Sequence, residues 1–183
     1  MKPKACKVCR EKFQSVRPLQ SCCSVDCAIQ HGRKLSDAKA AKGASERRAA
    51  HRAAKVKAKT LKEWLDEAQV LCNRYIRLRD GNKCISCGTE NPAIQYAAGH
   101  FRSRGAASHL RFSEDNINTQ CNYQCNSVLA GNIAKYRPAL IAKIGIARGE
   151  KLENDNTPHK WTIEEAKEKI IYFKNKLKDI ASL

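Results

Sequence analysis

The sequence predicts a mostly helical α+β protein in which small cysteine-rich elements accompany longer helices. Close pairs of cysteines occur at two places along the chain, and amphipathic helical patterns flank the second place on both sides. From these observations we expect a cysteine knuckle at residues 1–30, a basic helical linker at 31–59, and a folded domain with flanking helices at 60–183.

The chain is strongly basic. Its 183 residues include 35 Lys and Arg against 18 Asp and Glu, a formal net charge of +17. Exposed cations release counterions from phosphates, so this charge favours a nucleic acid as partner. The sequence has no long apolar run and no lipidation signal, and we expect no membrane partner. No apolar secretory core follows Met1–Lys4, which predicts a cytoplasmic protein.

The first cysteine group has the spacing of a zinc-ribbon or treble-clef-like knuckle. Ten cysteines in a reducing compartment are better explained by metal than by disulfides. A small apolar core is expected from Phe13 and Leu19, and Cys22 is an alternative to Cys23 as a ligand. The predicted ligands of one structural Zn²⁺ are Cys6, Cys9, Cys23 and Cys27.

Most of the positive charge lies before the folded domain, since residues 1–60 carry 16 Lys and Arg against 4 Asp and Glu. Large apolar side chains in residues 31–59 are limited to Leu35 and Val56, so this segment should be a solvated helix or a mobile linker. It is either a solubilising arm or a phosphate-binding one. The phosphate contacts we expect from it are Arg47, Arg48, Arg52 and Lys55.

Two amphipathic helices are predicted at the ends of the folded domain. Thr60 and Glu63 form a capping box, and apolar residues recur at helical spacing from there until Gly81. Thr162 and Glu165 open the second helix, which runs to about residue 180. Each helix is expected to bury one face against the residues between them.

Four further residues receive structural rather than chemical roles. Cys72 lies on the apolar face of the first helix and should belong to the core. Trp64 and Trp161 are expected to be core or cap residues. Pro138 can open a third helix, because proline is tolerated in the first helical turn.

The second cysteine group brackets the segment that carries the chemistry. Gly88 permits a tight turn after the first pair. Four thiolates leave no open coordination position, so this zinc should be structural and any catalytic metal must be another ion. The predicted ligands of this second Zn²⁺ are Cys84, Cys87, Cys121 and Cys125.

Between the two pairs we expect a strand from Ile94 to Phe101 that presents His100 at its C-terminal end. Arg111–Phe112 could begin the returning strand, and residues 116–121 should form a turn into a helix that begins near Cys125. Asn126 would stand one residue into that helix, opposite His100.

This segment resembles the HNH, or ββα-metal, nuclease superfamily. The motif elements that carry the resemblance are the cysteine pairs, Ala98-Gly99-His100, Asn116 and Asn126. Over nearly its full length the chain is similar to the NinG/Rap family of lambdoid phage recombination proteins, on phrases such as 84–88 and 161–165. The resemblance implies an HNH-like core and a structure-selective endonuclease that acts on Holliday junctions and D-loops in the cytoplasm of a bacteriophage's host.

The resemblance also implies roles for single residues. His100 matches the general base, Asn116 the residue that holds the neighbouring loop, and Asn126 a ligand of a catalytic Mg²⁺ or Mn²⁺. Phosphate contacts are expected among Arg102, Arg104 and Arg111.

The sequence departs from the superfamily pattern at two points. Gly99 stands where many relatives carry a metal-binding Asp, so the second metal ligand stays open. The candidates are Asp115, Asn118, Asn132, a backbone carbonyl or water. The Cys121–Cys125 spacing is one residue longer than the common CxxC, which makes Asn122 the alternative to Asn126.

Two other functions remain open beside the branched-DNA endonuclease. One is a non-catalytic, zinc-bearing DNA-binding recombination factor, which the missing Asp favours. The other is a restriction or homing endonuclease for plain duplex, which would need base-specific contacts that no segment predicts. Symmetric cleavage of a four-way junction would need two active sites, and so a homodimer.

Overall fold

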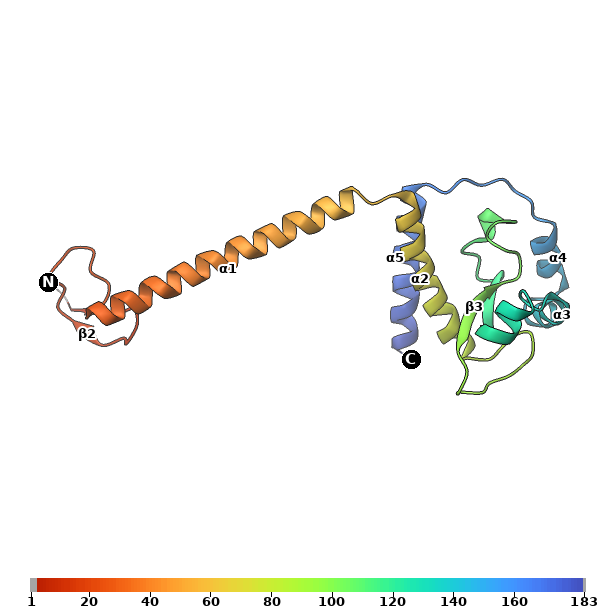
Figure 1. The fold of residues 1–183 in the computed structure, drawn as a ribbon, viewed down its shortest axis with the longest axis horizontal. Coiled ribbons are helices and arrows are strands. Elements are labelled where there is room, and N and C mark those ends of the chain that lie inside the picture. The colour runs from red at the N-terminus through yellow and green to blue at the C-terminus, as the bar shows by residue number, and fades with distance from the viewer. Residues whose placement is uncertain (1–2, 183) are drawn as a thin grey trace. The chain divides into compact units, whose positions relative to one another are not determined.

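The computed structural model describes residues 3–182. The chain divides into two units, residues 1–58 and 59–183. The first unit contains a short antiparallel hairpin of β1 (Lys4–Ala5) and β2 (Lys12–Phe13), followed by the long helix α1 (Val25–Lys57), as Figure 1 shows.

Helix α1 is exposed to solvent along its length. The Ser24 side chain caps it by accepting a hydrogen bond from the Cys27 N–H, and none of its residues is buried. Of the two predicted states of the basic segment, the structure has the solvated helix. The helix begins at Val25, because Ser24 supplies the cap, and therefore includes the last cysteine of the knuckle.

The predicted apolar core of the knuckle is wrong. Leu19 is 96% exposed, and Phe13 is only half-buried. The buried side chains of the knuckle are instead Cys6, Cys22 and Ser15. A module of this size has too little apolar surface to form a core, so the thiols occupy its centre.

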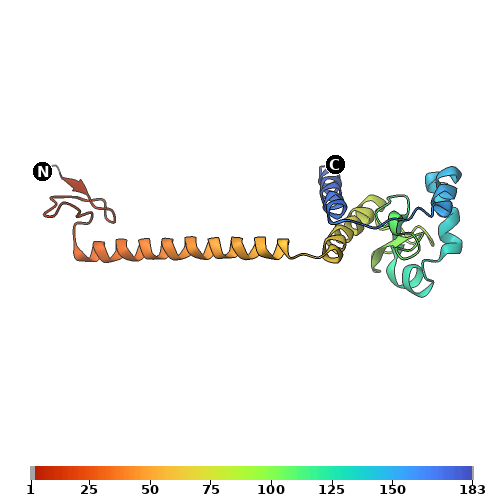
Figure 2. The ribbon, with the colours of Figure 1, turned by 90° about the horizontal axis from the view of Figure 1, so that it is seen from above.

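The second unit is built around one hairpin. In both views, α2 (Leu61–Asp80) and α5 (Ile163–Ala181) lie side by side on one side of the hairpin, and α3 (Ile133–Ile144) and α4 (Ile146–Asn154) lie on the other (Figures 1 and 2). The elements of this unit in chain order are α2, β3 (Tyr96–His100), the 3₁₀ helix η1 (Ser108–Leu110), β4 (Ile117–Cys121), the π-helix η2 (Asn122–Val128), α3, α4 and α5.

The two predicted flanking helices are confirmed, including both capping boxes. Their apolar faces form the main core, in which Phe173 and Cys72 are fully buried. Trp64 and Trp161 pack against this core as half-buried residues. None of the helices formed by residues 3–182 combines the length and the apolar character needed to cross a membrane.

The returning strand lies later in the chain than predicted. Strand β4 pairs antiparallel with β3, with His100 opposite Ile117 and Gly99 opposite Asn118. Arg111 instead follows the short helix η1, and residues 117–121, predicted as a turn, are the strand. All five residues of β4 are buried, and three of them are polar. A run of polar residues usually indicates an exposed turn, because buried polar groups need hydrogen-bond partners.

Two helix starts also differ from the prediction. Helix η2 begins at Asn122, three residues before Cys125. Helix α3 begins at Ile133, so Pro138 lies inside it, where it has no N–H to donate to the carbonyl of Ala134. Helix α4 was not predicted; it packs with α3 in a second apolar cluster that contains Ala107, Leu110, Tyr136, Leu140 and Leu152.

We expect Phe173→Ala to lower the free energy of unfolding by about 3–5 kcal/mol, because it leaves a cavity between α2 and α5. Ile171→Ala on the same helix should change it by less than about 0.5 kcal/mol, since Ile171 is 60% exposed. Urea denaturation followed by circular dichroism measures both values. Equal losses for the two variants would contradict this assignment of the core.

Candidate functional site: two thiol clusters and a histidine pocket

The second cysteine group converges on one point. The four Sγ atoms lie within 4.8 Å of one another, and those of Cys87 and Cys121 are 3.8 Å apart. A tetrahedron with Zn–S bonds of 2.3 Å has edges of about 3.8 Å, so this arrangement could hold zinc. The members are Cys84, Cys87, Cys121 and Cys125. They join the turn after α2 to the end of β4 and to η2.

The first cysteine group forms a similar cluster, which could also hold zinc. Its four Sγ atoms again lie within 4.8 Å of one another, and those of Cys9 and Cys23 are 3.4 Å apart. Cys23 belongs to the cluster, and Cys22 is buried outside it. The members are Cys6, Cys9, Cys23 and Cys27.

Crowding opposes the loss of all four thiol protons of a cluster together. The Val8 N–H lowers the pKa of Cys6 to about 5, but the pKa values of neighbouring thiols in the same cluster are shifted the other way. Hydrogen bonds with the thiols of Cys9 and Cys6 raise the pKa of Cys23 to about 12. Burial raises the pKa of the Cys125 thiol to about 12 in the other cluster. A divalent cation at the centre of each cluster would reverse these upward shifts, because it stabilises every thiolate at once.

His100, the last residue of β3, has its ring fixed by the backbone. Its Nε2 lies 3.0 Å from the carbonyl oxygen of Arg111. A carbonyl can only accept, so Nε2 carries the proton and Nδ1 keeps a lone pair. Burial lowers the pKa of His100, and the charges of Arg104 and Arg111 lower it further. The imidazole is therefore neutral at pH 7.

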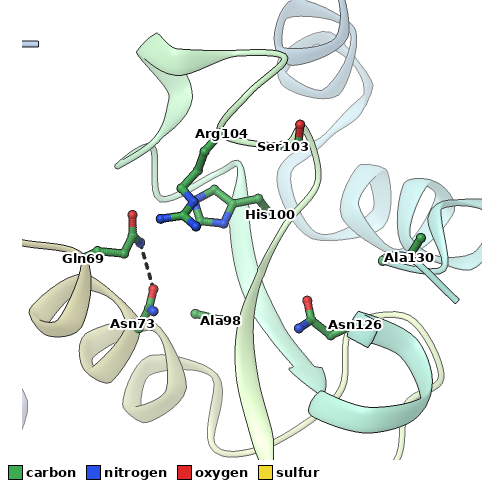
Figure 3. Close-up of a pocket in the computed structure, with 9 residues that line it drawn as sticks. Gln69, Asn73, Ala98, His100, Ser103, Arg104, Asn126 and Ala130 are labelled. Atoms are coloured by element: carbon green, nitrogen blue, oxygen red, sulfur yellow. Dashed lines mark hydrogen bonds between the residues drawn. The ribbon is translucent and has the colours of Figure 1, made fainter. Parts of the chain in front are cut away.

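The ring of His100 lines a cavity of about 340 Å³ (Figure 3). Strand β3, helix α2, the loop after β3 and the end of η2 contribute its walls. The other lining residues are Gln69, Asn73, Ala98, Ser103, Arg104, Asn126, Ala130 and Gly131. None of these lining residues carries a carboxylate, and Arg104 gives the cavity a positive charge.

Asn116 is fully buried and fastens the loop that follows His100. Its Oδ1 accepts the N–H of Arg102 at 2.8 Å. Its Nδ2 donates to the carbonyls of Arg102 and Leu110, at 3.0 and 3.1 Å. One side chain thus holds both ends of residues 102–110.

Asn126 lies at the cavity, whereas Asn122 lines a separate pocket that Cys87 and Cys121 also line. The extra residue between Cys121 and Cys125 is taken up by the wide turn of η2, in which the Leu129 N–H bonds the Gln124 carbonyl at 3.0 Å. The longer spacing therefore leaves Asn126 on the side of His100.

Gly99 is in close contact with two side-chain oxygens. A Cβ at this position would stand 2.0 Å from Oε1 of Gln120 and 3.1 Å from Oδ1 of Asn126. No residue with a side chain fits here unless Gln120 moves. The superfamily resemblance would place an Asp at position 99. In this chain the side chains of Gln120 and Asn126 occupy the space that the Asp side chain would need.

The three side-chain candidates for a second metal ligand each have a partner elsewhere, although for Asn132 only the amide nitrogen is engaged. The Asp115 carboxylate forms a bidentate ion pair with Arg148. Oδ1 of Asn118 accepts hydrogen bonds from Arg79 and Lys143. The amide nitrogen of Asn132 donates to the Sγ of Cys125.

Of the three arginines predicted to contact phosphate near His100, one lies at the cavity and two are bonded to other parts of the protein. Arg104 lines the cavity, but Arg102 donates to the carbonyls of Leu152 and Asp155 and thereby anchors its loop to the end of α4. The Arg111 guanidinium donates to Gln69 on α2. On α1, the four candidates Arg47, Arg48, Arg52 and Lys55 are all exposed.

Sequence reasoning missed three polar residues at or beside the cavity. Gln69 and Asn73 lie one turn apart on α2 and are joined by a hydrogen bond of 2.8 Å (Figure 3). Their signal was a polar i, i+4 pair within an otherwise apolar helix face. Gln120 gave no signal, because it lies in the strand that was predicted as a turn.

Comparison with known sequences gives consistent matches. A family profile described as "Bacteriophage Lambda NinG protein" matches residues 1–182. The chain is 46% identical to "Protein ninG" of Salmonella phage P22 and 44% identical to that of Escherichia phage lambda, each over 118 residues that cover 64% of this chain and 57% of the relative.

A third relative is similar over a longer range. The chain is 35% identical over 194 aligned residues to "Protein ninG" of Escherichia phage 933W, which covers 96% of this chain and 92% of the relative. No solved structure matches the chain.

We expect purified protein to contain two zinc ions per chain, and Cys23→Ser to contain one. Cys22→Ser is the matched control, because Cys22 lies beside Cys23 but outside the thiol cluster, and it should keep both ions. Elemental analysis against protein concentration measures the ratio. Equal zinc content in the two variants would contradict the assignment of Cys23 as a ligand.

Proposed function

The chain belongs to the NinG family of bacteriophage proteins, and from that premise we propose that it is a metal-dependent endonuclease of the HNH, or ββα-metal, type. Its substrates would be branched DNA recombination intermediates such as Holliday junctions and D-loops. It would act in the cytoplasm of the infected bacterium, with two structural zinc ions and as a homodimer where two opposed strands are cut.

The geometry of His100 is the main support for this proposal. The hydrogen bond to the Arg111 carbonyl leaves Nδ1 free to accept a proton from water. The lowered pKa keeps the ring in its neutral, basic form near pH 7. A water molecule that loses its proton to this nitrogen becomes a nucleophile for a phosphodiester. Asn116 keeps the Arg111 carbonyl in place, because it holds the loop that leads to it.

The charge of the cavity suits a phosphate. Among the described residues that line it, Arg104 is the one with a charged side chain, and Ser103 adds a hydroxyl group. A guanidinium can bind a phosphate through two parallel hydrogen bonds. We therefore assign Arg104, rather than Arg102 or Arg111, to the strand that is cut.

The oxygen donors beside His100 fit a hard divalent cation. Asn126 presents Oδ1 toward Gly99, while its Nδ2 donates to Asn122. Amide oxygens are ligands that Mg²⁺ and Mn²⁺ accept. When bound, such a cation would stabilise negative charge on the phosphate and on the leaving oxygen. The thiol cluster would keep Asn126 in place, because Cys125 immediately precedes it.

Helix α1 supports a DNA partner. Its exposed Arg and Lys side chains can contact phosphates, and such contacts carry no sequence information. Recognition through phosphates suits a substrate distinguished by its shape.

A second function, a DNA-binding recombination factor without catalysis, is favoured by the absence of a carboxylate at Gly99, and the following experiment separates the two.

His100→Ala should reduce cleavage of a labelled four-way junction by about 10²–10⁴-fold, because the general base is lost. The wild type should cut the junction only with Mg²⁺ or Mn²⁺ and should cut a matched linear duplex much less. Zinc content and junction binding are measured for both proteins and should be equal.

His51→Ala is the matched control, because this histidine is exposed on α1, and it should cut as the wild type does. Junction binding without cutting by the wild type, with Mn²⁺ also tested, would overturn the endonuclease and leave the binding factor.

Replacing Arg47, Arg48, Arg52 and Lys55 together by Ala should weaken binding to every DNA sequence alike. The slope of log affinity against log salt should fall by about 3–4, because four phosphate contacts are lost. A variant with four exposed lysines of the second unit replaced, Lys160, Lys167, Lys174 and Lys178, makes the same change in net charge. Equal effects of both sets would show that only net charge matters.

A further inference from the structure

Gln120 is a fully buried amide whose orientation is fixed. Its Nε2 lies 2.6 Å from both the hydroxyl of Ser86 and the carbonyl of Gly131. Because the Gly131 carbonyl can only accept, the nitrogen must face it and the oxygen must face the other way. That oxygen, Oε1, has no hydrogen-bond partner among residues 3–182.

An unpaired buried amide oxygen is uncommon and unfavourable in a folded protein. Here it points at Gly99. In the antiparallel register Ala97 pairs with Gln120 and Gly99 with Asn118, so Gly99 and Gln120 belong to the same face of the hairpin. The lack of a side chain at Gly99 allows Oε1 to lie 2.0 Å from the Cβ position.

A second oxygen faces the same point. Oδ1 of Asn126 lies 3.1 Å from the Cβ position of Gly99. Asn126, whose Oδ1 faces this point, also lines the cavity of His100 (Figure 3). Two amide oxygens from different elements, β4 and η2, therefore converge beside the residue that precedes His100.

We propose that Oε1 of Gln120 and Oδ1 of Asn126 together bind the divalent cation, and that Gln120 supplies the ligand that an Asp at position 99 would otherwise provide. This inference rests on the proposed function. It accounts for three observations at once: the glycine at 99, the unpaired oxygen of Gln120, and the engagement of the Asp115 and Asn118 oxygens elsewhere.

A site with two neutral ligands leaves the charge of the cation uncompensated. Its affinity for the cation alone is then low, and a DNA phosphate beside it adds the missing negative charge. The cation and the DNA accordingly bind with positive cooperativity, which distinguishes this site from one built on carboxylates.

Paramagnetic broadening by Mn²⁺ tests the proposal without cleavage. In zinc-loaded, ¹⁵N-labelled protein, Mn²⁺ should broaden the backbone signal of Gly99 and the side-chain signals of Asn126 and Gln120 before others. Gln120→Met removes the oxygen while keeping the length of the side chain, and should raise the apparent Kd for Mn²⁺ by about tenfold or more.

Gln124→Met is the matched control, because Gln124 is an exposed residue of η2, and its Kd should equal that of the wild type. Unchanged broadening in folded Gln120→Met would overturn the proposal and would show that Oε1 only packs against Gly99. Circular dichroism and zinc content establish that the variant is folded.

The double variant Gly99→Asp/Gln120→Ala keeps the proposal testable if Gln120→Met does not fold. It places a carboxylate in the space that Oε1 occupies, and should bind Mn²⁺ more tightly than the wild type does. Tighter binding would support the site, and an absence of broadening at Asn126 would overturn it.

The two hypotheses fail in different ways. Selective Mn²⁺ broadening at Gly99 and Asn126 in a protein that cuts no junction would support the cation site and contradict the endonuclease. Junction cutting that depends on His100 but is the same in Gln120→Met would support the endonuclease and contradict Gln120 as a ligand.

Discussion

Strand β4 buries three polar side chains in succession, where water cannot supply their hydrogen bonds. Their hydrogen-bond partners lie on α2, on α3 and in the segments around the hairpin, and of their polar atoms only Oε1 of Gln120 is left without one among residues 3–182. Asn118 bonds Tyr136 of α3 and Arg79 of α2, and the Thr119 hydroxyl donates to the carbonyl of Ile76 on α2. Gln120 bonds the segments that precede β3 and follow η2. The strand thus determines where the surrounding helices can lie.

The same constraint explains how the site is kept in place. His100 stands at the end of β3, opposite the first residue of β4, and its ring is held by a carbonyl from the loop that Asn116 fastens. Asn126 comes directly after Cys125, which the thiol cluster joins to Cys121, the last residue of β4. His100 and Asn126 therefore reach one cavity because both are positioned by β4.

The sequence was sufficient where the signals are local. Helices α2 and α5 carry capping boxes and apolar stripes, and the cysteine pairs carry a spacing that brings four sulfurs together. Strand β4 could not be predicted, since its polar residues are explained only by partners far along the chain. The relation of Gln120 to Gly99 could not be predicted either, because it depends on the register of β3 and β4.

The wide turn of η2 separates two geometric requirements that a regular helix would couple. Zinc binding requires a short distance between the sulfurs of Cys121 and Cys125. The position of Asn126 at the cavity requires instead that its side chain point in one direction from the helix axis. In an α-helix each residue turns this direction by about 100°. In a regular helix an extra residue between the two cysteines would therefore rotate Asn126 away from the cavity, whereas the wide turn of η2 takes up that residue and keeps Asn126 beside His100.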